Sequence, residues 1–364
     1  LFDLAIALCF LRAAGDVSFD PTGRLFLGEL SLDGDVRAVR GVLPLVLEAR
    51  RRGFSEAYVP LANAAEAALV EGIAIFAVAS LREAIAHLNE EAVDPETVEG
   101  GSVGGSLLSP QPRTEISDTA FEPEIDLSDI KGQETAKRGL EIAAAGGHNI
   151  ALFGPAGTGK TMLAKALAGI LPPLDFDAVI ETTGIHSSAG FLSDAVMTRP
   201  PFRAPHHTTS YVAMVGGGVI PKPGEVTLAH NGVLFLDEFP EFDRKVLETL
   251  RQPLEERMVS ISRARGSSLF PANFILIAAL NPCPCGNAGT SKPCECAPQH
   301  LARYERRLSG PIMDRIDIWI EVSKIDYEAL AEGAQGAGES APMRARVARA
   351  RGRARARYAD ATRR

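Results

Sequence analysis

The clearest chemistry in the chain lies in one glycine-rich stretch of eight residues, which fits the pattern G-x-x-x-x-G-K-[ST] and reads Gly154-Pro155-Ala156-Gly157-Thr158-Gly159-Lys160-Thr161. Glycines let a backbone wrap around phosphate groups, and the first turn of a following helix adds N–H donors and a favourable dipole. Lys160 would reach the terminal phosphates of a nucleoside triphosphate, and the Thr161 hydroxyl would ligate Mg²⁺. An apolar strand precedes the stretch and an Ala- and Leu-rich helix follows it, so a chance glycine-rich turn explains the context less well.

Two adjacent carboxylates, Asp237 and Glu238, end an apolar run that begins at Gly232. Doubly wound sheets place their ligand chemistry at the carboxyl ends of strands. Asp237 can hold Mg²⁺ there, and Glu238 is placed to polarise the attacking water. Such a pair could instead cap the next helix, but the nearby phosphate loop favours the catalytic interpretation.

Two further polar residues are catalytic candidates. Asn281 ends the apolar strand Phe274 to Leu280, where its amide could orient the attacking water or sense the γ-phosphate; the alternative is a turn residue. Arg315 precedes the apolar run Ile316 to Val322 and could stabilise transition-state charge at a neighbouring subunit's ATP. A salt bridge with Asp314 or Asp317 is the alternative for Arg315.

Four of the five cysteines lie close together in the sequence, at Cys283, Cys285, Cys294 and Cys296. Four thiolates can bind Zn²⁺ tetrahedrally, although the C-x-C spacing differs from the usual C-x₂₋₄-C pairs. Reduced structural cysteines are the alternative. Cys9 stands alone in an apolar run, and we expect it to be a core residue.

The elements that position these residues form two predicted domains. Residues 1–92 alternate strand-like and helix-like runs, which indicates an α/β domain. Residues 93–125 are rich in Gly, Ser, Pro and acids and are predicted to be a flexible linker. Residues 126–322 again alternate strands and helices, which predicts a doubly wound parallel sheet, and residues 323–364 turn helical.

Composition sets limits on the class of protein. The 364 residues are 46% hydrophobic and 23% charged, with no apolar run long enough to span a membrane and no export signal, so we expect a cytoplasmic protein that lacks its true start. The net charge of −8 argues against a uniformly basic surface. Nine arginines follow Met343 against Asp360 alone, so the tail could form a basic arm for phosphates or a solvated helix.

With Ile130-Lys131-Gly132-Gln133 ahead of the phosphate loop, these elements in this order resemble an AAA+ ATPase. Three longer stretches are similar to the magnesium-chelatase-like branch of YifB and ComM: Phe202-Arg203-Ala204-Pro205-His206-His207-Thr208-Thr209-Ser210, Gly224-Glu225-Val226-Thr227-Leu228-Ala229-His230-Asn231-Gly232 and Asn281-Pro282-Cys283-Pro284-Cys285-Gly286. The similarity covers nearly the whole chain. It implies an AAA+ fold with ATP and Mg²⁺ as cofactors, and residues 323–364 as the start of a truncated helical lid. The missing rest of that lid makes hydrolysis by this chain alone an open question.

The N-terminal part resembles the proteolytic domain of Lon, whose fold is shared with the second domain of a small-subunit ribosomal protein. The resemblance rests on Gly28 to Gly34 and on Arg40 to Pro60. Lon-type sequences carry a catalytic lysine in the helix after the glycine, but Gly41 to Leu47 contains none, and no nucleophilic serine motif appears. We therefore expect a catalytically inactive domain.

The resemblance implies a function on DNA, because ComM-like proteins are hexameric motors that drive branch migration during natural transformation. A homo-hexamer and single-stranded or branched DNA are then the expected partners. The family would carry Arg203, His206 and His207 on loops that face the ring's pore; a local hydrogen-bonded turn or a metal site is the alternative for the histidines. A predicted hairpin, Val259 to Phe270, offers Arg263 and Arg265 for backbone phosphates, and aromatic residues for base stacking are scarce in both segments.

Two other functions compete with the DNA motor. One is a protein-remodelling ATPase akin to a magnesium chelatase motor subunit. The other is an ATP-dependent protease with a degenerate Lon-like half, against which the missing lysine counts.

Overall fold

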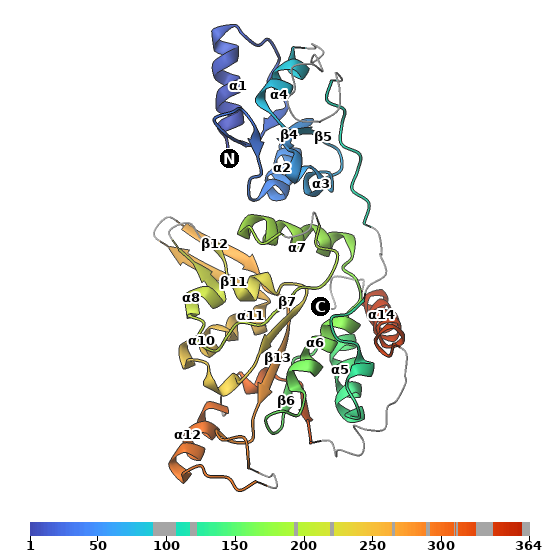
Figure 1. The fold of residues 1–364 in the computed structure, drawn as a ribbon, viewed down its shortest axis with the longest axis vertical. Coiled ribbons are helices and arrows are strands. Elements are labelled where there is room, and N and C mark those ends of the chain that lie inside the picture. The colour runs from blue at the N-terminus through green and yellow to red at the C-terminus, as the bar shows by residue number, and fades with distance from the viewer. Residues whose placement is uncertain are drawn as a thin grey trace. The chain divides into compact units, whose positions relative to one another are not determined.

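The computed structural model describes residues 1–89, 107–116, 122–192, 196–218, 222–263, 266–288, 292–308, 310, 312–324 and 338–358. The chain divides into two compact units, one comprising residues 1–117 and 176–197 and the other residues 118–175 and 198–364. Each unit contains a parallel sheet with helices (Figure 1), which confirms the predicted α/β class.

The first unit is built on a three-stranded parallel sheet in the order β1-β4-β5, with β1 at Arg24–Phe26, β4 at Glu56–Pro60 and β5 at Ala74–Val78. Its helices are α1 (Asp3–Ala14), α2 (Val42–Arg51), α3 (Ala64–Ala67) and α4 (Leu81–Leu88), with a 3₁₀ turn at Leu61–Asn63 and a small antiparallel pair, β2 (Glu29–Leu30) and β3 (Val36–Arg37). Tyr58 stacks between Phe26 and Phe76 at ring-centroid distances of 4.8 and 4.9 Å. These rings hold the three strands together in an apolar core.

Part of the segment predicted to be a linker lies along this sheet. Gln111 donates its N–H to Ile75 O at 2.7 Å, and the Thr114 hydroxyl donates to Ala65 O at 2.7 Å. Residues 107–116 therefore have defined partners in the first unit, while residues 93–106 of the predicted linker lie outside the described residues.

The prediction that Cys9 is a core residue was wrong, because its side chain is exposed on α1. That helix buries Leu4 and Leu8, one turn apart, and leaves Ile6 and Phe10 exposed at 66% and 72%. An apolar residue on such a helix can face either way, so the apolar run by itself did not indicate the side that Cys9 takes.

Helix α7 (Phe176–Ala189) belongs to the first unit, although the predicted domain 126–322 includes it. It packs against α2, and the N–H of Gly41 donates to both the carbonyl and the hydroxyl of Ser187, at 3.2 and 3.1 Å. The chain thus returns to the first unit between α6 (Lys160–Ile170) and β7 (Phe202–Arg203).

The second unit contains a five-stranded, fully parallel sheet in the order β14-β6-β13-β10-β7. The strands are β6 (Ile150–Phe153), β7 (Phe202–Arg203), β10 (Val233–Leu236), β13 (Ile275–Leu280) and β14 (Ile318–Glu321). Alternate residues of the central strands enter two different apolar clusters, because successive side chains point to opposite faces. Both faces are therefore covered, as the continuous apolar runs predicted.

The helices α5 (Glu134–Gly146), α6 (Lys160–Ile170) and α14 (Ser340–Arg357) pack side by side on one face (Figure 1). The remaining helical elements are α8 (Tyr211–Val215), α9 (Glu225–Leu228), α10 (Arg244–Thr249), α11 (Arg251–Glu256) and α12 (Pro298–Leu308), with 3₁₀ turns η3 (Leu127–Asp129), η4 (Phe239–Glu241) and η5 (Met313–Arg315). Two antiparallel pairs complete the unit: β8 (Gly216–Gly217) with β9 (Lys222–Pro223), and β11 (Met258–Arg263) with β12 (Gly266–Pro271), the latter at the predicted hairpin.

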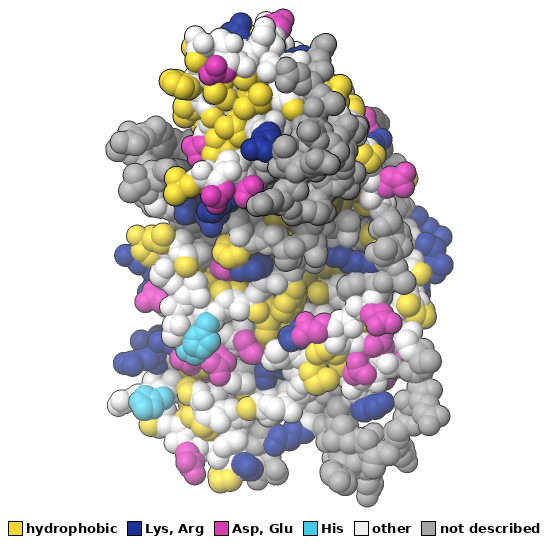
Figure 2. Space-filling model, turned by 45° about the horizontal axis from the view of Figure 1, so that its top comes forward, with side chains coloured by type: hydrophobic (Ala, Val, Ile, Leu, Met, Phe, Trp, Pro, Cys, Tyr) yellow, Lys and Arg dark blue, Asp and Glu magenta, His cyan; other side chains and the backbone are white. Residues whose placement is uncertain are grey.

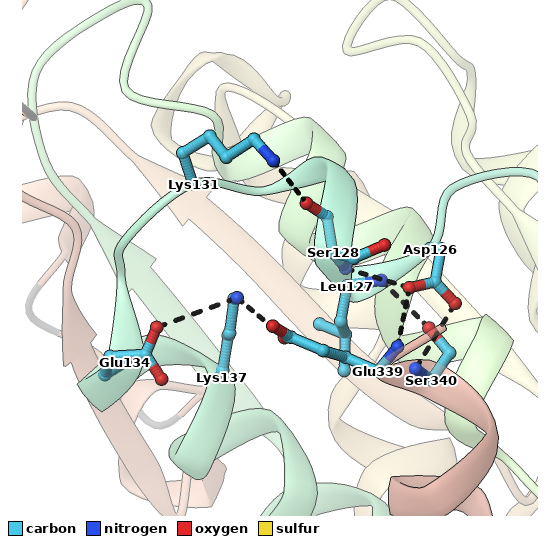
Figure 3. Close-up of polar contacts among 8 residues, drawn as sticks. All are labelled: Asp126, Leu127, Ser128, Lys131, Glu134, Lys137, Glu339 and Ser340. Atoms are coloured by element: carbon cyan, nitrogen blue, oxygen red, sulfur yellow. Dashed lines mark hydrogen bonds and ion pairs between the residues drawn. The ribbon is translucent and has the colours of Figure 1, made fainter. Parts of the chain in front are cut away.

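The start of α14 is fastened to the segment before α5 (Figure 3). Asp126 accepts the N–H groups of Glu339 and Ser340 at 3.0 and 3.2 Å, and the Ser340 hydroxyl accepts the N–H of Leu127 at 2.9 Å. Burial opposes ionisation of Asp126, but hydrogen bonds from Ser128 and Ser340 outweigh it and lower its pKa to about 2. The Asp126 carboxylate thus supplies acceptors for two N–H groups at the helix start.

Arginines of α14 bond to the second unit itself. Arg344 donates to Gly169 O at 2.9 Å, Arg351 donates to Ala144 O at 2.8 Å, and Arg355 pairs with Asp175 at 2.8 Å. The described part of the arginine-rich run is therefore a helix with one packed face rather than a free basic arm, and Arg349, Arg353 and Arg357 are exposed, as expected of a solvated helix.

Candidate active site

The glycine-rich loop joins the end of β6 to the first turn of α6. Gly157 and Gly159 have φ angles of +76° and +92°, a region that side-chain-bearing residues rarely adopt. A Cβ atom on Gly154 would lie 2.1 Å from the carbonyl oxygen of Val322, just beyond β14, so the backbone approaches too closely for any other residue. The loop thus has the backbone conformation that a phosphate cradle requires.

Lys160 turns its ammonium group back into this loop. Its Nζ donates to the carbonyls of Gly154 and Pro155, both at 2.7 Å, and to Asn281 Oδ1 at 3.0 Å. Only 8% of Lys160 is exposed, and this burial lowers its pKa while the charge of Asp237 opposes the shift. The positive charge is therefore held where the phosphates of a bound nucleotide would lie.

Thr161 and Asp237 form the second contact of the site. The Thr161 hydroxyl donates to Asp237 Oδ2 at 3.0 Å, so a hydroxyl and a carboxylate oxygen from α6 and from the end of β10 meet. Oxygen donors of this kind are what Mg²⁺ takes alongside waters and phosphate oxygens. The two side chains therefore fit the predicted magnesium position.

Glu238 has a strained backbone, with φ at +49° and ψ at +44°. Its N–H donates to Asp237 Oδ1 at 2.9 Å, and its Oε2 lies 3.2 Å from Nδ1 of His207. Non-glycine residues in the left-handed region cluster at functional sites, because the surrounding structure must hold them there.

Asn281 links the phosphate loop to a helix further along the chain. Its side chain accepts from Lys160, and its main-chain carbonyl accepts the hydroxyl of Tyr304 in α12 at 2.8 Å. Burial raises the pKa of Tyr304 to about 12, so the hydroxyl stays a donor at neutral pH. The structure thus connects Lys160 with Asn281, Thr161 with Asp237, and Glu238 with His207, all at the carboxyl ends of neighbouring strands.

Arg315 lies in η5, just ahead of β14. Its guanidinium pairs with Glu255 of α11, and its carbonyl accepts from Asn149 Nδ2 at 2.9 Å. The salt bridge is thus made with Glu255, neither of the two aspartates that the sequence offered as partners. Asp317 instead accepts the N–H of Asn149 at 3.0 Å.

Of the five residues predicted to contact DNA, three have described side chains, and these make contacts within the chain. Arg203 of β7 makes two hydrogen bonds with the carboxylate of Glu225, at 2.7 and 2.8 Å. His206 lies 2.9 Å from the Thr208 hydroxyl, and its ring centroid lies 4.1 Å from that of His207. A local hydrogen-bonded turn is therefore present at the two histidines. The side chain of Arg263 and all of Arg265 lie outside the described residues.

A cleft of about 1010 Å³ opens beside His207, and the sequence reasoning missed it. Its lining includes six basic side chains and three acidic ones: Arg244, Lys245, Arg251, Arg303, Arg306 and Arg307, with Glu241, Asp243 and Glu248. The sequence did contain a signal for this cleft. Arg303, Arg306 and Arg307 are spaced three and four residues apart, which places them on one face of α12. Over the face shown in Figure 2, basic and acidic side chains are interspersed.

The four clustered cysteines come together in space. Their sulfur atoms all lie within 4.8 Å of one another, and Cys283 is buried. We call this group the cysteine cluster (Cys283, Cys285, Cys294 and Cys296). It follows Asn281 directly and so lies beside the nucleotide loop.

Across the described residues, no helix is both long and apolar enough to cross a bilayer.

Known proteins resemble this chain over both units. The family model "Magnesium chelatase, subunit ChlI" matches residues 126–330, and "Subunit ChlI of Mg-chelatase" matches residues 1–63. The competence protein ComM of Haemophilus influenzae is 42% identical over 356 residues, which is 96% of this chain and 67% of that protein. The YifB protein of Escherichia coli is 40% identical over 354 residues, which is 97% of this chain and 66% of that protein.

An uncharacterised protein of Mycobacterium tuberculosis is 43% identical over 355 residues, covering 96% of this chain and 67% of that protein. Among solved structures, a complex between subunits BchI and BchD of magnesium chelatase gives a TM-score of 0.42 at 22% identity, covering 65% of this chain and 74% of that one, a likeness too low to bear on function. The family match and the sequence relatives confirm the resemblance drawn from the motifs: this chain belongs to the magnesium chelatase ChlI family, as a YifB/ComM-type protein of the AAA+ class.

Proposed function

We propose that this chain is the ATP-hydrolysing part of a ring motor that acts on DNA and drives branch migration during recombination and natural transformation. The observation that carries the proposal is the contact between His207 and Glu238 at 3.2 Å. His207 lies in a stretch that follows β7, and Glu238 is the candidate for polarising water. A ligand that displaces this stretch would therefore change the position of the hydrolytic carboxylate.

ATP and Mg²⁺ are the proposed cofactors of the nucleotide site. Residues 154–161 would hold the phosphates, with Lys160 on the terminal ones, and Thr161 and Asp237 would hold the metal. Bound Mg²⁺ supplies charge neutralisation on the phosphate oxygens. Glu238 orients the attacking water. Asn281 holds Lys160 and that water in position at the γ-phosphate. At the cysteine cluster we propose a third cofactor, Zn²⁺.

The proposed assembly is a homo-hexamer in the cytoplasm. Arg315 would act on ATP held by the neighbouring copy, where a guanidinium stabilises charge that develops on the transferred phosphoryl group. It would have to leave Glu255 to do so. The contact with Glu255 thus marks a resting position for the side chain.

DNA is the proposed substrate for two reasons. A relative that aligns over nearly the whole chain is named a competence protein. In addition, the cleft beside His207 presents Arg303, Arg306 and other cations, which suit phosphates and carry no base specificity. Lon-type proteolysis remains excluded from the proposal because the first unit lacks the catalytic lysine.

The family model favours one second candidate, because it describes a magnesium chelatase subunit. In that case the motor would remodel a protein partner instead of moving DNA.

The test is ATP hydrolysis by the intact protein with no DNA, with single-stranded DNA and with forked DNA, together with strand displacement on the fork. Glu238→Gln serves as the inactive control. We expect DNA to stimulate hydrolysis and the fork to be unwound. An active ATPase that neither DNA stimulates would exclude the DNA motor and favour the protein-remodelling candidate.

A further inference from the structure

The cysteine cluster has the geometry of a four-thiolate metal site. A tetrahedral zinc with bonds of about 2.3 Å to sulfur separates its sulfur ligands by about 3.8 Å. Here the Sγ atoms of Cys285 and Cys294 are 3.7 Å apart, as are those of Cys294 and Cys283, while Cys283 and Cys285 are 3.3 Å apart. All four are free thiols, so no disulfide accounts for their closeness.

One backbone N–H group is directed at a sulfur of the cluster, and a tight turn surrounds that sulfur. The N–H of Ala288 donates to the sulfur of Cys283 at 3.2 Å, and the N–H of Gly286 closes a turn onto the carbonyl of Cys283 at 2.9 Å. Gly286 has a φ angle of +75°, which the turn requires. Donors directed at a sulfur stabilise its negative charge, as the groups around a metal ligand do.

The same turn touches the nucleotide loop at two points. Asn281, two positions before Cys283, accepts a hydrogen bond from Lys160. A Cβ atom on Gly286 would lie 3.6 Å from the Cβ of Ala156, which places the turn in van der Waals range of the loop.

The helix that follows the last cysteine of the cluster also contacts Asn281. Cys296 leads directly into α12, and Tyr304 of that helix donates to the Asn281 carbonyl at 2.8 Å. Asn281 is thus held from both sides of the cluster, by the chain before Cys283 and by the helix after Cys296.

We propose that the cysteine cluster binds Zn²⁺, and that the metal ties the two chain segments together so that Asn281 keeps its place beside Lys160. Four protein thiolates leave no open position, so the zinc is structural and takes no part in the chemistry. The positioning role rests on the proposed ATPase function; zinc binding does not.

Metal content tests the binding half. The purified intact protein is analysed by mass spectrometry for metals, beside Cys285→Ser, Cys296→Ser and the matched control Cys9→Ser, whose thiol lies on α1 in the first unit. We expect about one zinc per chain in the wild type and in Cys9→Ser, and a loss of at least about tenfold in zinc affinity in the other two. Replacement by Co²⁺ should give the absorption of tetrahedral cobalt thiolate. Absence of metal in the wild type, or equal zinc in all four proteins, would overturn the proposal.

Nucleotide kinetics test the positioning half. Zinc is removed from the folded wild type with a chelator and restored, while circular dichroism monitors folding; this arm decides the matter even if the serine variants do not fold. We expect zinc removal to lower kcat about tenfold while the Kd of a fluorescent ATP analogue changes little, because Lys160 and the glycine loop remain in place.

Asn281→Ala provides the internal comparison. It should lower kcat in the zinc-loaded protein, and chelation should then have little further effect, because both changes remove the same contact. A zinc-free protein with unchanged kcat would overturn the positioning role. Neither arm contains DNA, so failure here is distinct from failure of the DNA motor.

Discussion

Nδ1 of His207 lies 3.2 Å from Oε2 of Glu238, and the two residues follow adjacent strands, β7 and β10, of the same sheet. A carboxylate that polarises water needs a free lone pair directed at that water. The imidazole of His207 occupies one of the two carboxylate oxygens of Glu238. If Glu238 polarises the attacking water, as we propose, hydrolysis will depend on where the stretch around His207 lies.

His207→Ala should free Glu238 from this contact. We expect DNA-independent hydrolysis to rise several-fold and stimulation by DNA to shrink, because the link between the two is gone. Phosphate release measured with and without single-stranded DNA checks this. His148→Ala, which removes a histidine paired with Asp317 at 3.4 Å, is the matched control. Lower basal hydrolysis with undiminished stimulation would contradict the prediction.

Lys160 and Glu238 should separate binding from chemistry. Lys160→Ala is expected to abolish nucleotide binding, whereas Glu238→Gln should bind normally and lose about 10²-fold or more in kcat, the range for loss of a general base. Titration with a fluorescent ATP analogue measures nucleotide binding, and single-turnover phosphate release measures the chemical step. If the alanine variant binds as tightly as the wild type, the glycine-rich loop is not the nucleotide site.

Arg315 should matter only in an assembly. Arg315→Ala is expected to lower kcat by about 10³-fold with nucleotide binding retained, which is the scale of an arginine that stabilises phosphoryl transfer. Glu255→Gln should keep kcat, since it only releases the guanidinium. Mixing Arg315→Ala with wild-type protein should lower hydrolysis more than dilution does. A variant that loses thermal stability but keeps kcat would show that the pair with Glu255 is purely structural.

Asp126 should make stability depend on pH at the acid end. Its pKa is about 2 in the folded protein against an ordinary value of 3.8, so its stabilising effect is complete above about pH 4 and is lost as pH falls toward 2. Asp126→Asn should lower the free energy of unfolding by roughly 1 kcal/mol at neutral pH, as loss of a helix cap does. The unfolding free energies of the wild type and the variant, measured with denaturant, should converge as pH falls to about 2. The exposed Asp33→Asn is the control; a pH-independent gap would contradict the assignment.

The strands that carry the candidate site were predictable because buried parallel strands read as unbroken apolar runs. The apolar strand expected before the glycine-rich loop is present at Ile150–Phe153, and the apolar runs predicted before Asp237 and Asn281 begin one residue ahead of the observed strands. Because these strands are parallel neighbours, the residues that follow them, among them Lys160, Asp237 and Asn281, lie at the same edge of the sheet.

The features that could not be predicted from the sequence depend on contacts between residues far apart in the chain. Helix α7 joins the first unit through Gly41 and Ser187, which no local pattern reveals. The pairing of His207 with Glu238 depends on β7 lying next to β10. The arginines of α14 look solvated in the sequence, yet Arg344 and Arg351 find main-chain carbonyls on α6 and α5.

The close approach of Gly154 to Val322 has a mechanical consequence. The N–H of Val322 donates to Phe153 O at 2.7 Å, and β14 runs from there back toward Arg315 without interruption of its pairing to β6. With no Cβ at Gly154, the backbone of the phosphate loop lies directly against the residue that follows this strand, so a shift of the strand would press on the loop. In the ring that we propose, a displacement of Arg315 toward a neighbouring copy's nucleotide would shift β14, and through this contact it would change the position of the phosphate loop in its own copy.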